Sequence, residues 1–154
     1  MLSTGDTVAD FTLQDADGND VTWSSLRGSP VVVFFYPKAN TPGCTKEACA
    51  FRDLAPEFEA KGVKVLGMSA DTVKRQSNFR EKYELTMPLL ADTERTVIEA
   101  WGVWQEKKNY GRTYMGIVRS TFLFNADGEV AFVWPKVRVK GHADAVLEKV
   151  NELF

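Results

Sequence analysis

The chain lacks any long apolar run: no stretch approaches the roughly 18 consecutive apolar residues that suggest a membrane-spanning helix. Its first residues, MLSTGDTVADFTLQDADG, also lack the basic and apolar regions of a secretory signal. Basic residues are not in surplus, with 19 Lys and Arg against 21 Asp and Glu, and a formal charge of -2 argues against the broad basic surface that nonspecific nucleic-acid binding requires. We therefore expect a cytoplasmic protein that binds neither membranes nor nucleic acid.

Cysteine and histidine are scarce, with two cysteines and one histidine among 154 residues. Two cysteines cannot form a disulfide scaffold, and in a reducing compartment a close pair more often serves redox chemistry or metal binding. A zinc ion would find only Cys44, Cys49 and His142, so it would still need a carboxylate or a second subunit. We therefore expect neither a bound metal nor a cofactor.

The remaining composition is that of a globular protein, with 44% apolar and 26% charged residues. The length suits one domain, since chains of about 100–200 residues usually form a single core. No internal repeat, low-complexity tract or linker rich in Pro, Gly or Ser interrupts the sequence. Residues 1–154 are therefore predicted to form a single domain.

Apolar periodicity and turn signals predict an alternation of strands and helices. Strands are predicted at residues 11–13, 21–23, 31–36, 63–69, 87–91, 115–124 and 129–134. Helices are predicted at 44–61, 72–83, 94–101 and 141–154. The first of these is expected to break just before Pro56, with Asp53 as the cap of a second short helix. Residues 105–113, with Lys107, Lys108 and Arg112, are predicted to be an exposed loop, and His142 is expected to cap the last helix or pack against it.

The order of these elements predicts the fold class. The unbroken apolar run at 31–36 is typical of a central strand that is buried on both faces. Crossover helices give parallel neighbouring strands, whereas the hairpins signalled by Asp-Gly at 17–18 and 127–128 add antiparallel ones. The chain is therefore predicted to be an α/β protein with a thioredoxin-like fold, in which helices flank a mixed central β-sheet that carries an N-terminal β-hairpin.

A helix start directly precedes the first cysteine. Thr41 suits the N-cap and Pro42 the first helical position, which places Cys44 in the first turn. Free backbone N–H groups and the helix dipole favour a thiolate there, and a thiol pKa of about 6 would raise the thiolate fraction at pH 7 about 30-fold. Enzymes commonly need about 10⁶-fold or more, so other groups must contribute at the sulfur. Gly43 leaves its N–H open to a small ligand, and the Thr41 hydroxyl can donate or accept.

A known family has this pattern. Residues 37–44, PKANTPGC, resemble the peroxiredoxin motif of Pro, three residues, Thr, two residues and Cys, and residues 45–49, TKEAC, resemble the bacterioferritin comigratory protein (peroxiredoxin Q) branch. The resemblance covers nearly the whole chain, at residues 5–13, 31–53, 65–71, 119–122 and 134–142. It implies a thiol peroxidase that reduces hydrogen peroxide and organic hydroperoxides, including alkyl hydroperoxides.

The resemblance also implies roles for the two cysteines. Cys44 would be the peroxidatic cysteine, which forms a sulfenic acid, and Cys49 the resolving cysteine, which converts it into an intramolecular disulfide. A thioredoxin-type dithiol protein would then reduce that disulfide. Because the resolving cysteine lies in the same chain, no dimer is needed for the chemistry, and we expect a monomer.

Four further residues take roles from the resemblance. Thr41 would orient the peroxide, and Arg119 would hold the thiolate and polarise the peroxide. Pro37 and Pro42 would shield the pocket from water. Arginine suits its role because it stays charged and donates through a fixed fork. Eight arginines occur in the chain, and only the match of Arg-Ser-Thr-Phe at 119–122 selects Arg119.

Helix geometry separates the two cysteines. Residues five apart on an α-helix have Cα atoms about 8.6 Å from each other, and a disulfide needs less than about 7 Å. If one intact helix carries both Cys44 and Cys49, its first turns must unwind before the sulfurs can bond. Taken without Cys44, Cys49 would be read as a small buried residue between two alanines.

Two other functions remain open from the residues. One is a general thiol–disulfide oxidoreductase of the same fold, without special reactivity toward peroxide, for which C-x-x-C would be the typical spacing. The other is a redox sensor or metal-dependent binding module, which more His or Cys ligands would favour. The spacing of four residues between the cysteines and the Thr-x-x-Cys pattern favour the peroxidase.

Overall fold

The computed structural model describes all of residues 1–154. One sheet has seven strands in the order β2-β1-β5-β4-β3-β8-β9. Its strands are β1 (Thr12–Gln14), β2 (Asp20–Thr22), β3 (Val31–Phe35), β4 (Lys64–Ser69), β5 (Leu89–Ala91), β8 (Ser120–Phe124) and β9 (Val130–Trp134). A second sheet pairs β6 (Trp104–Asn109) with β7 (Arg112–Ile117). The helices are η1 (Trp23–Leu26, 3₁₀), α1 (Pro42–Asp53), α2 (Ala55–Ala60), α3 (Val73–Tyr83), α4 (Thr96–Ala100) and α5 (His142–Leu153).

Strand β3 lies at the centre of the large sheet, as its sequence predicts. It runs parallel to β4 and antiparallel to β8, and all of its residues are buried. The N-terminal hairpin of β1 and β2 joins the same sheet through a single bridge between Gln14 and Ala91. The predicted mixed sheet flanked by helices is thus confirmed.

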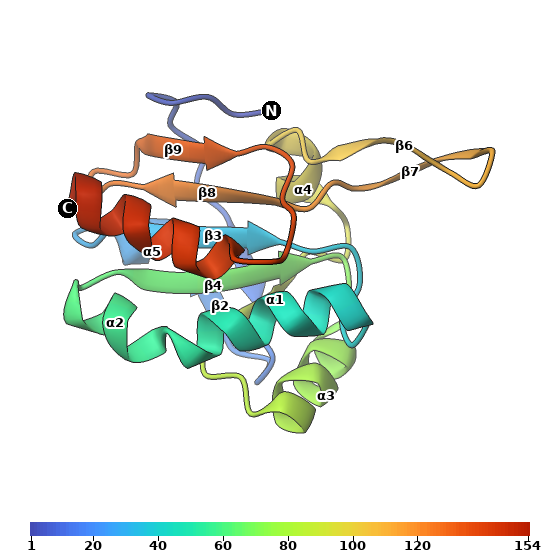
Figure 1. Cartoon of the computed structure of the whole chain (residues 1–154), viewed down its shortest axis with the longest axis horizontal. Coiled ribbons are helices and arrows are strands. Elements are labelled where there is room, and N and C mark those ends of the chain that lie inside the picture. The colour runs from blue at the N-terminus through green and yellow to red at the C-terminus, as the bar shows by residue number, and fades with distance from the viewer.

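Side-chain alternation along β3 divides the core into two clusters. Val32 and Phe34 face α1, α2, α3 and α5, whose contributions include Phe51, Phe58, Phe79 and Val146. Val33 and Phe35 face the other side, where η1 and α4 supply residues such as Trp23 and Ile98. Figure 1 shows α1, α2 and α5 over one face of the sheet and α4 behind it. The two covered faces explain why the β3 sequence is apolar at every position.

Helix α1 is held by its apolar face. Ala48 and Phe51 are buried there, and the Phe51 ring stacks on Phe34 with a centroid distance of 4.6 Å. Truncating such a buried aromatic typically costs about 3–5 kcal/mol. The predicted break is confirmed, because α1 ends at Asp53 and α2 begins at Ala55, with Pro56 in its first turn, where a missing N–H is tolerated.

Three details of the predicted elements are wrong. The single strand predicted at 115–124 is divided, because β7 ends at Ile117 and β8 begins at Ser120 in the other sheet. Leu54, not Asp53, is the N-cap of α2, and no side chain caps it; Asp53 is exposed and pairs with Arg52 at 2.9 Å. Residues 105–113 are not a loop, because they belong to the β6–β7 hairpin, which projects from the body of the protein (Figure 1). Most of this hairpin is exposed on both faces, so its sequence carries no alternation of apolar and polar residues.

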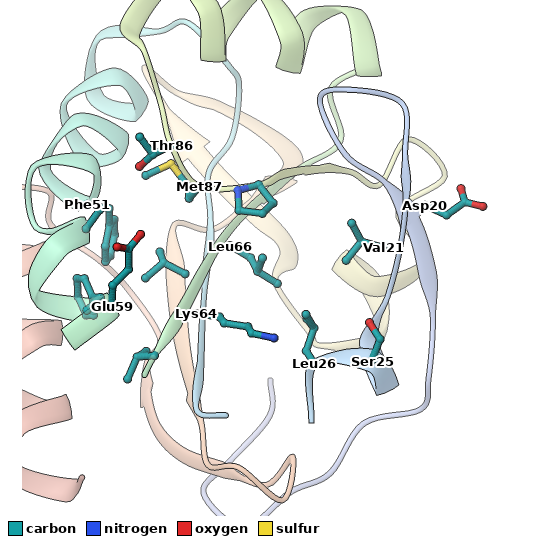
Figure 2. Close-up of a pocket in the computed structure, with 15 residues that line it drawn as sticks. Asp20, Val21, Ser25, Leu26, Phe51, Glu59, Lys64, Leu66, Thr86 and Met87 are labelled. Atoms are coloured by element: carbon teal, nitrogen blue, oxygen red, sulfur yellow. The ribbon is translucent and has the colours of Figure 1, made fainter. Parts of the chain in front are cut away.

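An apolar cavity of about 440 Å³ opens where the large sheet is incomplete. Figure 2 shows Leu66 of β4 between Phe51 on one side and Leu26 of η1 on the other. The Gly67 N–H donates to the Pro88 carbonyl at 3.0 Å, and Pro88 has no N–H to continue the pairing toward Val65. Proline therefore leaves the first half of β4 without a neighbour on this side.

No helix combines the length and the apolar character needed to cross a membrane.

Candidate active site

The loop between β3 and α1 delivers Cys44 to the edge of the sheet. Asn40 has a φ of 64°, a left-handed conformation that Asn adopts readily, and it turns the chain into α1. Thr41 is the N-cap and Pro42 begins the helix, as predicted, so Cys44 lies in the first turn with only 1% of its surface exposed. The Thr41 hydroxyl donates to the Lys38 carbonyl at 2.7 Å and caps no backbone N–H. Its oxygen is therefore left as an acceptor.

A buried polar network holds the loop between β3 and α1 in place. The Asp71 carboxylate accepts hydrogen bonds from the Ala39 N–H and the Ser69 hydroxyl, both at 2.7 Å. Gln76 donates to the Ser69 hydroxyl at 2.9 Å and accepts from the Tyr36 hydroxyl. Burial raises the pKa of Tyr36, so its hydroxyl stays protonated and can donate. Sequence reasoning did not select these residues, although the resemblance at 65–71 includes Ser69 and Asp71.

Arg119 contacts the sulfur. It lies between β7 and β8, and its Nη2 donates to Cys44 Sγ at 3.3 Å while its Nη1 donates to Glu47 Oε1 at 2.9 Å. Cys44 and Glu47 are three residues apart, so they lie on one face of α1 within reach of the two ends of the guanidinium fork. Burial opposes the charge of Arg119, but Glu47 and Cys44 outweigh it, so the pKa of Arg119 is raised and the group stays charged.

Glu47 is the acidic residue of the site, and sequence reasoning missed it. Its side chain is 1% exposed, and Oε2 has no hydrogen-bond partner. Burial raises its pKa to about 7, against the opposing effect of Arg119. Its position one turn after Cys44 was the available signal, but only the fold brings it to Arg119, 72 residues away in the sequence.

Glu47 predicts a pH dependence of stability. Its pKa is higher in the folded protein than the ordinary value of 4.5, so its contribution is fully present below pH 4.5 and is lost as the pH rises through about 7. Between pH 5 and pH 8 the free energy of unfolding should fall by about 2.5 kcal/mol more in the wild type than in Glu47→Gln. Urea unfolding at both pH values checks this; equal losses would show that Glu47 ionises as easily in the folded chain as in the unfolded one.

The other predicted pocket residues surround the sulfur less closely. A Cβ placed on Gly43 would lie 3.2 Å from Arg119 Nη2, so the absence of a side chain leaves room for the guanidinium. Pro37 is half-buried and Pro42 is exposed, at the two ends of the loop. Their shielding of the pocket stays a prediction.

Cys49 lies on the same intact helix as Cys44. Both thiols are free, and Cys49 is half-buried. Five residues of α-helix place the two Cα atoms about 8.6 Å apart, beyond the reach of a disulfide. The folded conformation thus keeps the two sulfurs from bonding.

The environment of His142 agrees with the prediction, whereas that of Lys107 does not. His142 is buried and packs at the start of α5, where Nε2 lies 2.8 Å from Thr121 Oγ1 and the ring meets Phe51 edge-on. Burial, and then the charge of Arg119, lower its pKa to about 4, so it is neutral near pH 7. Lys107 is not a fully solvated residue, because it is half-buried and its ammonium donates to the Ile117 carbonyl at 2.9 Å.

Reaction of a thiol with peroxide requires an anionic sulfur and donors that stabilise the departing oxygen. Cys44 combines the first turn of a helix with an arginine at hydrogen-bond distance, an arrangement that suits the reaction of a thiol with a peroxide. The chain belongs to the AhpC/TSA family, whose model matches residues 4–133, and it is therefore a thiol peroxidase.

Relatives with known names agree. Peroxiredoxin Bcp of Escherichia coli is 44% identical over 151 residues, which cover 98% of this chain and 97% of that protein. A putative peroxiredoxin of Mycobacterium tuberculosis is 46% identical over 141 residues, or 92% of this chain and 90% of its own. These relatives identify the Bcp and peroxiredoxin Q branch as the part of the family that this chain resembles.

Solved structures also agree. Peroxiredoxin Q of Xanthomonas campestris has a TM-score of 0.89 at 42% identity, with 93% of this chain and 90% of that chain covered. A mutant of Xylella fastidiosa PrxQ has a TM-score of 0.94 at 35% identity, covering 99% and 97%. The thioredoxin-like fold predicted from the sequence is thus confirmed.

Proposed function

We propose that Cys44 is the nucleophile of the peroxidase reaction. The observation that carries this assignment is the 3.3 Å contact between Arg119 Nη2 and Cys44 Sγ in a buried site. The Cys44 thiolate attacks one oxygen of the hydroperoxide, the O–O bond breaks, and the sulfur becomes a sulfenic acid while the other oxygen leaves as alkoxide or hydroxide and takes up a proton. Arg119 stabilises the thiolate before the attack and the negative oxygen as it departs.

Thr41, Gly43 and the two prolines complete the proposed pocket. The Thr41 hydroxyl uses its proton on the Lys38 carbonyl, so its oxygen can accept the hydroperoxide O–H and orient the peroxide. The Gly43 backbone offers approach without a side chain, and Pro37 and Pro42 limit water at the sulfur.

Cys49 resolves the sulfenic acid in this proposal. Its thiol attacks the Cys44 sulfur, the S–O bond breaks, and water leaves as the disulfide forms. Oxidation also removes the thiolate charge that Arg119 holds, which weakens the contact at the start of α1, while the stacking of Phe51 on Phe34 retains the end of the helix. Unwinding is thereby confined to the turns between Cys44 and Phe51.

Hydrogen exchange checks this unwinding. Backbone amides of residues 44–51 are expected to exchange markedly faster in the disulfide form than in the reduced form, whereas those of the buried strand β3 should keep their protection as an internal control. Unchanged protection over 44–51 in the disulfide form would contradict the unwinding step.

The proposed substrates are hydrogen peroxide and alkyl hydroperoxides, and the proposed reductant is a thioredoxin-type dithiol protein. A study of Xanthomonas campestris bacterioferritin comigratory protein concerns the alkyl peroxide reduction activity of that protein, which supports the second substrate class. Recycling by a dithiol suits a reducing compartment, so we place the protein in the cytoplasm. A resolving cysteine in the same chain supports a monomer as the working form.

Peroxide consumption with a thioredoxin system as electron donor tests the proposed function. We expect turnover with hydrogen peroxide and with tert-butyl hydroperoxide. A protein that reduces disulfide substrates but reacts with peroxide no faster than a free thiol would instead be a general thiol–disulfide oxidoreductase.

A further inference from the structure

The β6–β7 hairpin, which we call the arm (residues 104–117), leads directly into the junction that carries Arg119. Lys107 pairs with Tyr114 and Lys108 with Thr113, so strand alternation places the two lysines on opposite faces. Lys107 is half-buried and Lys108 is exposed. The arm projects from the sheet next to the junction that carries Arg119 (Figure 1).

The Lys107 side chain is built into the base of the arm. A Cβ placed on Gly116 would lie 3.0 Å from Lys107 Cδ. The lysine stem therefore passes directly over Gly116, and a larger residue at position 116 would displace the stem. Its Nζ donates to the Ile117 carbonyl at 2.9 Å. An ammonium has three donors, so two remain after this bond.

That bond anchors the backbone that leads to Arg119. Two other hydrogen bonds hold the same junction: Val118 N–H donates to the Val103 carbonyl at 2.8 Å, and the Arg119 carbonyl accepts from Val137 N–H at 2.8 Å. The Lys107 bond is the member of this set that also brings a positive charge. Losing it removes one of the three hydrogen bonds that hold the segment immediately before the guanidinium that contacts Cys44.

The neighbouring charges influence Lys107. Burial and then the charge of Arg119 lower the pKa of Lys107, whereas the effect of Cys44 opposes this. Glu47 is the carboxylate in contact with Arg119, and its own raised pKa shows that burial disfavours its ionised form.

We propose that Lys107 is a positioning residue of the peroxidase site, which holds Arg119 against the sulfur through the Ile117 carbonyl. The inference rests on the proposed function in one respect, namely that Cys44 is the reacting thiol. It assigns the arm a task that its sequence, predicted as a solvated loop, did not indicate.

The test measures the ionisation of Cys44 in a Cys49→Ser background, where Cys44 is the sole thiol, from the pH dependence of alkylation by iodoacetamide. Lys107→Met keeps most of the stem but removes the charge and the donor, and it is expected to raise the midpoint of the thiolate curve by about one pH unit. Lys108→Met, on the opposite face of the same arm, is the matched control and should leave the midpoint unchanged. Lys107→Arg should restore it.

An unshifted midpoint in folded Lys107→Met protein would overturn the proposal, because a purely structural lysine would alter stability and not the thiol. An equal shift in Lys108→Met would also overturn it, since the effect would then belong to the overall charge of the arm. If Lys107→Met does not fold, Lys107→Gln carries the same measurement. Alkylation needs no peroxide, so the result decides the role of Lys107 even if the wild type fails to consume peroxide and the proposed function is wrong.

Discussion

Cys44→Ser is expected to lower peroxide-dependent turnover to the uncatalysed background, with both hydrogen peroxide and organic hydroperoxides. A serine hydroxyl does not ionise near neutral pH, and neither the helix N-terminus nor Arg119 can make it a nucleophile comparable to a thiolate. Serine is close to cysteine in size and shape, so the variant should keep the fold although the site is buried, which circular dichroism and thermal unfolding can verify. Turnover is measured as peroxide loss in the presence of a thioredoxin system.

Cys49→Ser is the matched control for this result. It should still consume one equivalent of peroxide at the wild-type rate, but it should stop at a Cys44 sulfenic acid that a trapping reagent such as dimedone labels. The two variants therefore separate the first chemical step from resolution. Undiminished turnover in Cys44→Ser, or loss of the first step in Cys49→Ser, would show that the roles of the two cysteines have been assigned in the wrong order.

Arg119→Met is expected to slow the reaction of reduced protein with peroxide by about 10²–10³-fold, the usual loss when a donor to a developing oxyanion is removed. The substitution removes the donor to Cys44 Sγ and also leaves the buried Glu47 without its cation. Glu47 should then take up a proton, because its pKa, already about 7, loses the effect that lowers it. Stopped-flow tryptophan fluorescence follows the oxidation rate.

Arg119→Lys should recover only part of the loss. An ammonium keeps the charge, but it lacks the fork that reaches Cys44 and Glu47 at the same time. The double variant Arg119→Lys with Glu47→Gln tests this explanation further, because it removes the carboxylate that is the second acceptor of residue 119. A folded Arg119→Met protein that reacts at the wild-type rate would refute the role of Arg119 as the donor to the reacting sulfur and the departing oxygen.

Local signals in the sequence were enough to predict the elements that carry Cys44. The apolar run at 31–36 fixes the central strand because both faces are covered, and Thr41 with Pro42 marks the helix start. Pro56 similarly marks the break between α1 and α2. A single domain over residues 1–154 stays a prediction, and the large sheet joins strands from both ends of the chain.

The missed residues acquire their roles through distant contacts. Glu47 looks like an ordinary surface residue of a helix until the fold places Arg119 beside it. Asp71 similarly meets the loop at Ala39 only because β4 lies next to β3. Lys107 lies in a hairpin that has little core to cover, so no periodicity marks its strands. Arg119 itself was selected by its match to a family motif, because eight arginines are equivalent on charge alone.

The most direct test of the central claim is to add one equivalent of hydrogen peroxide to the reduced wild-type protein and to follow its free thiols and intact mass, with non-reducing gels. The account predicts rapid loss of both thiols and of two hydrogen atoms in mass, with the protein remaining a monomer on the gel. Oxidation no faster than that of a free thiol, or a product that is a disulfide-linked dimer, would contradict it.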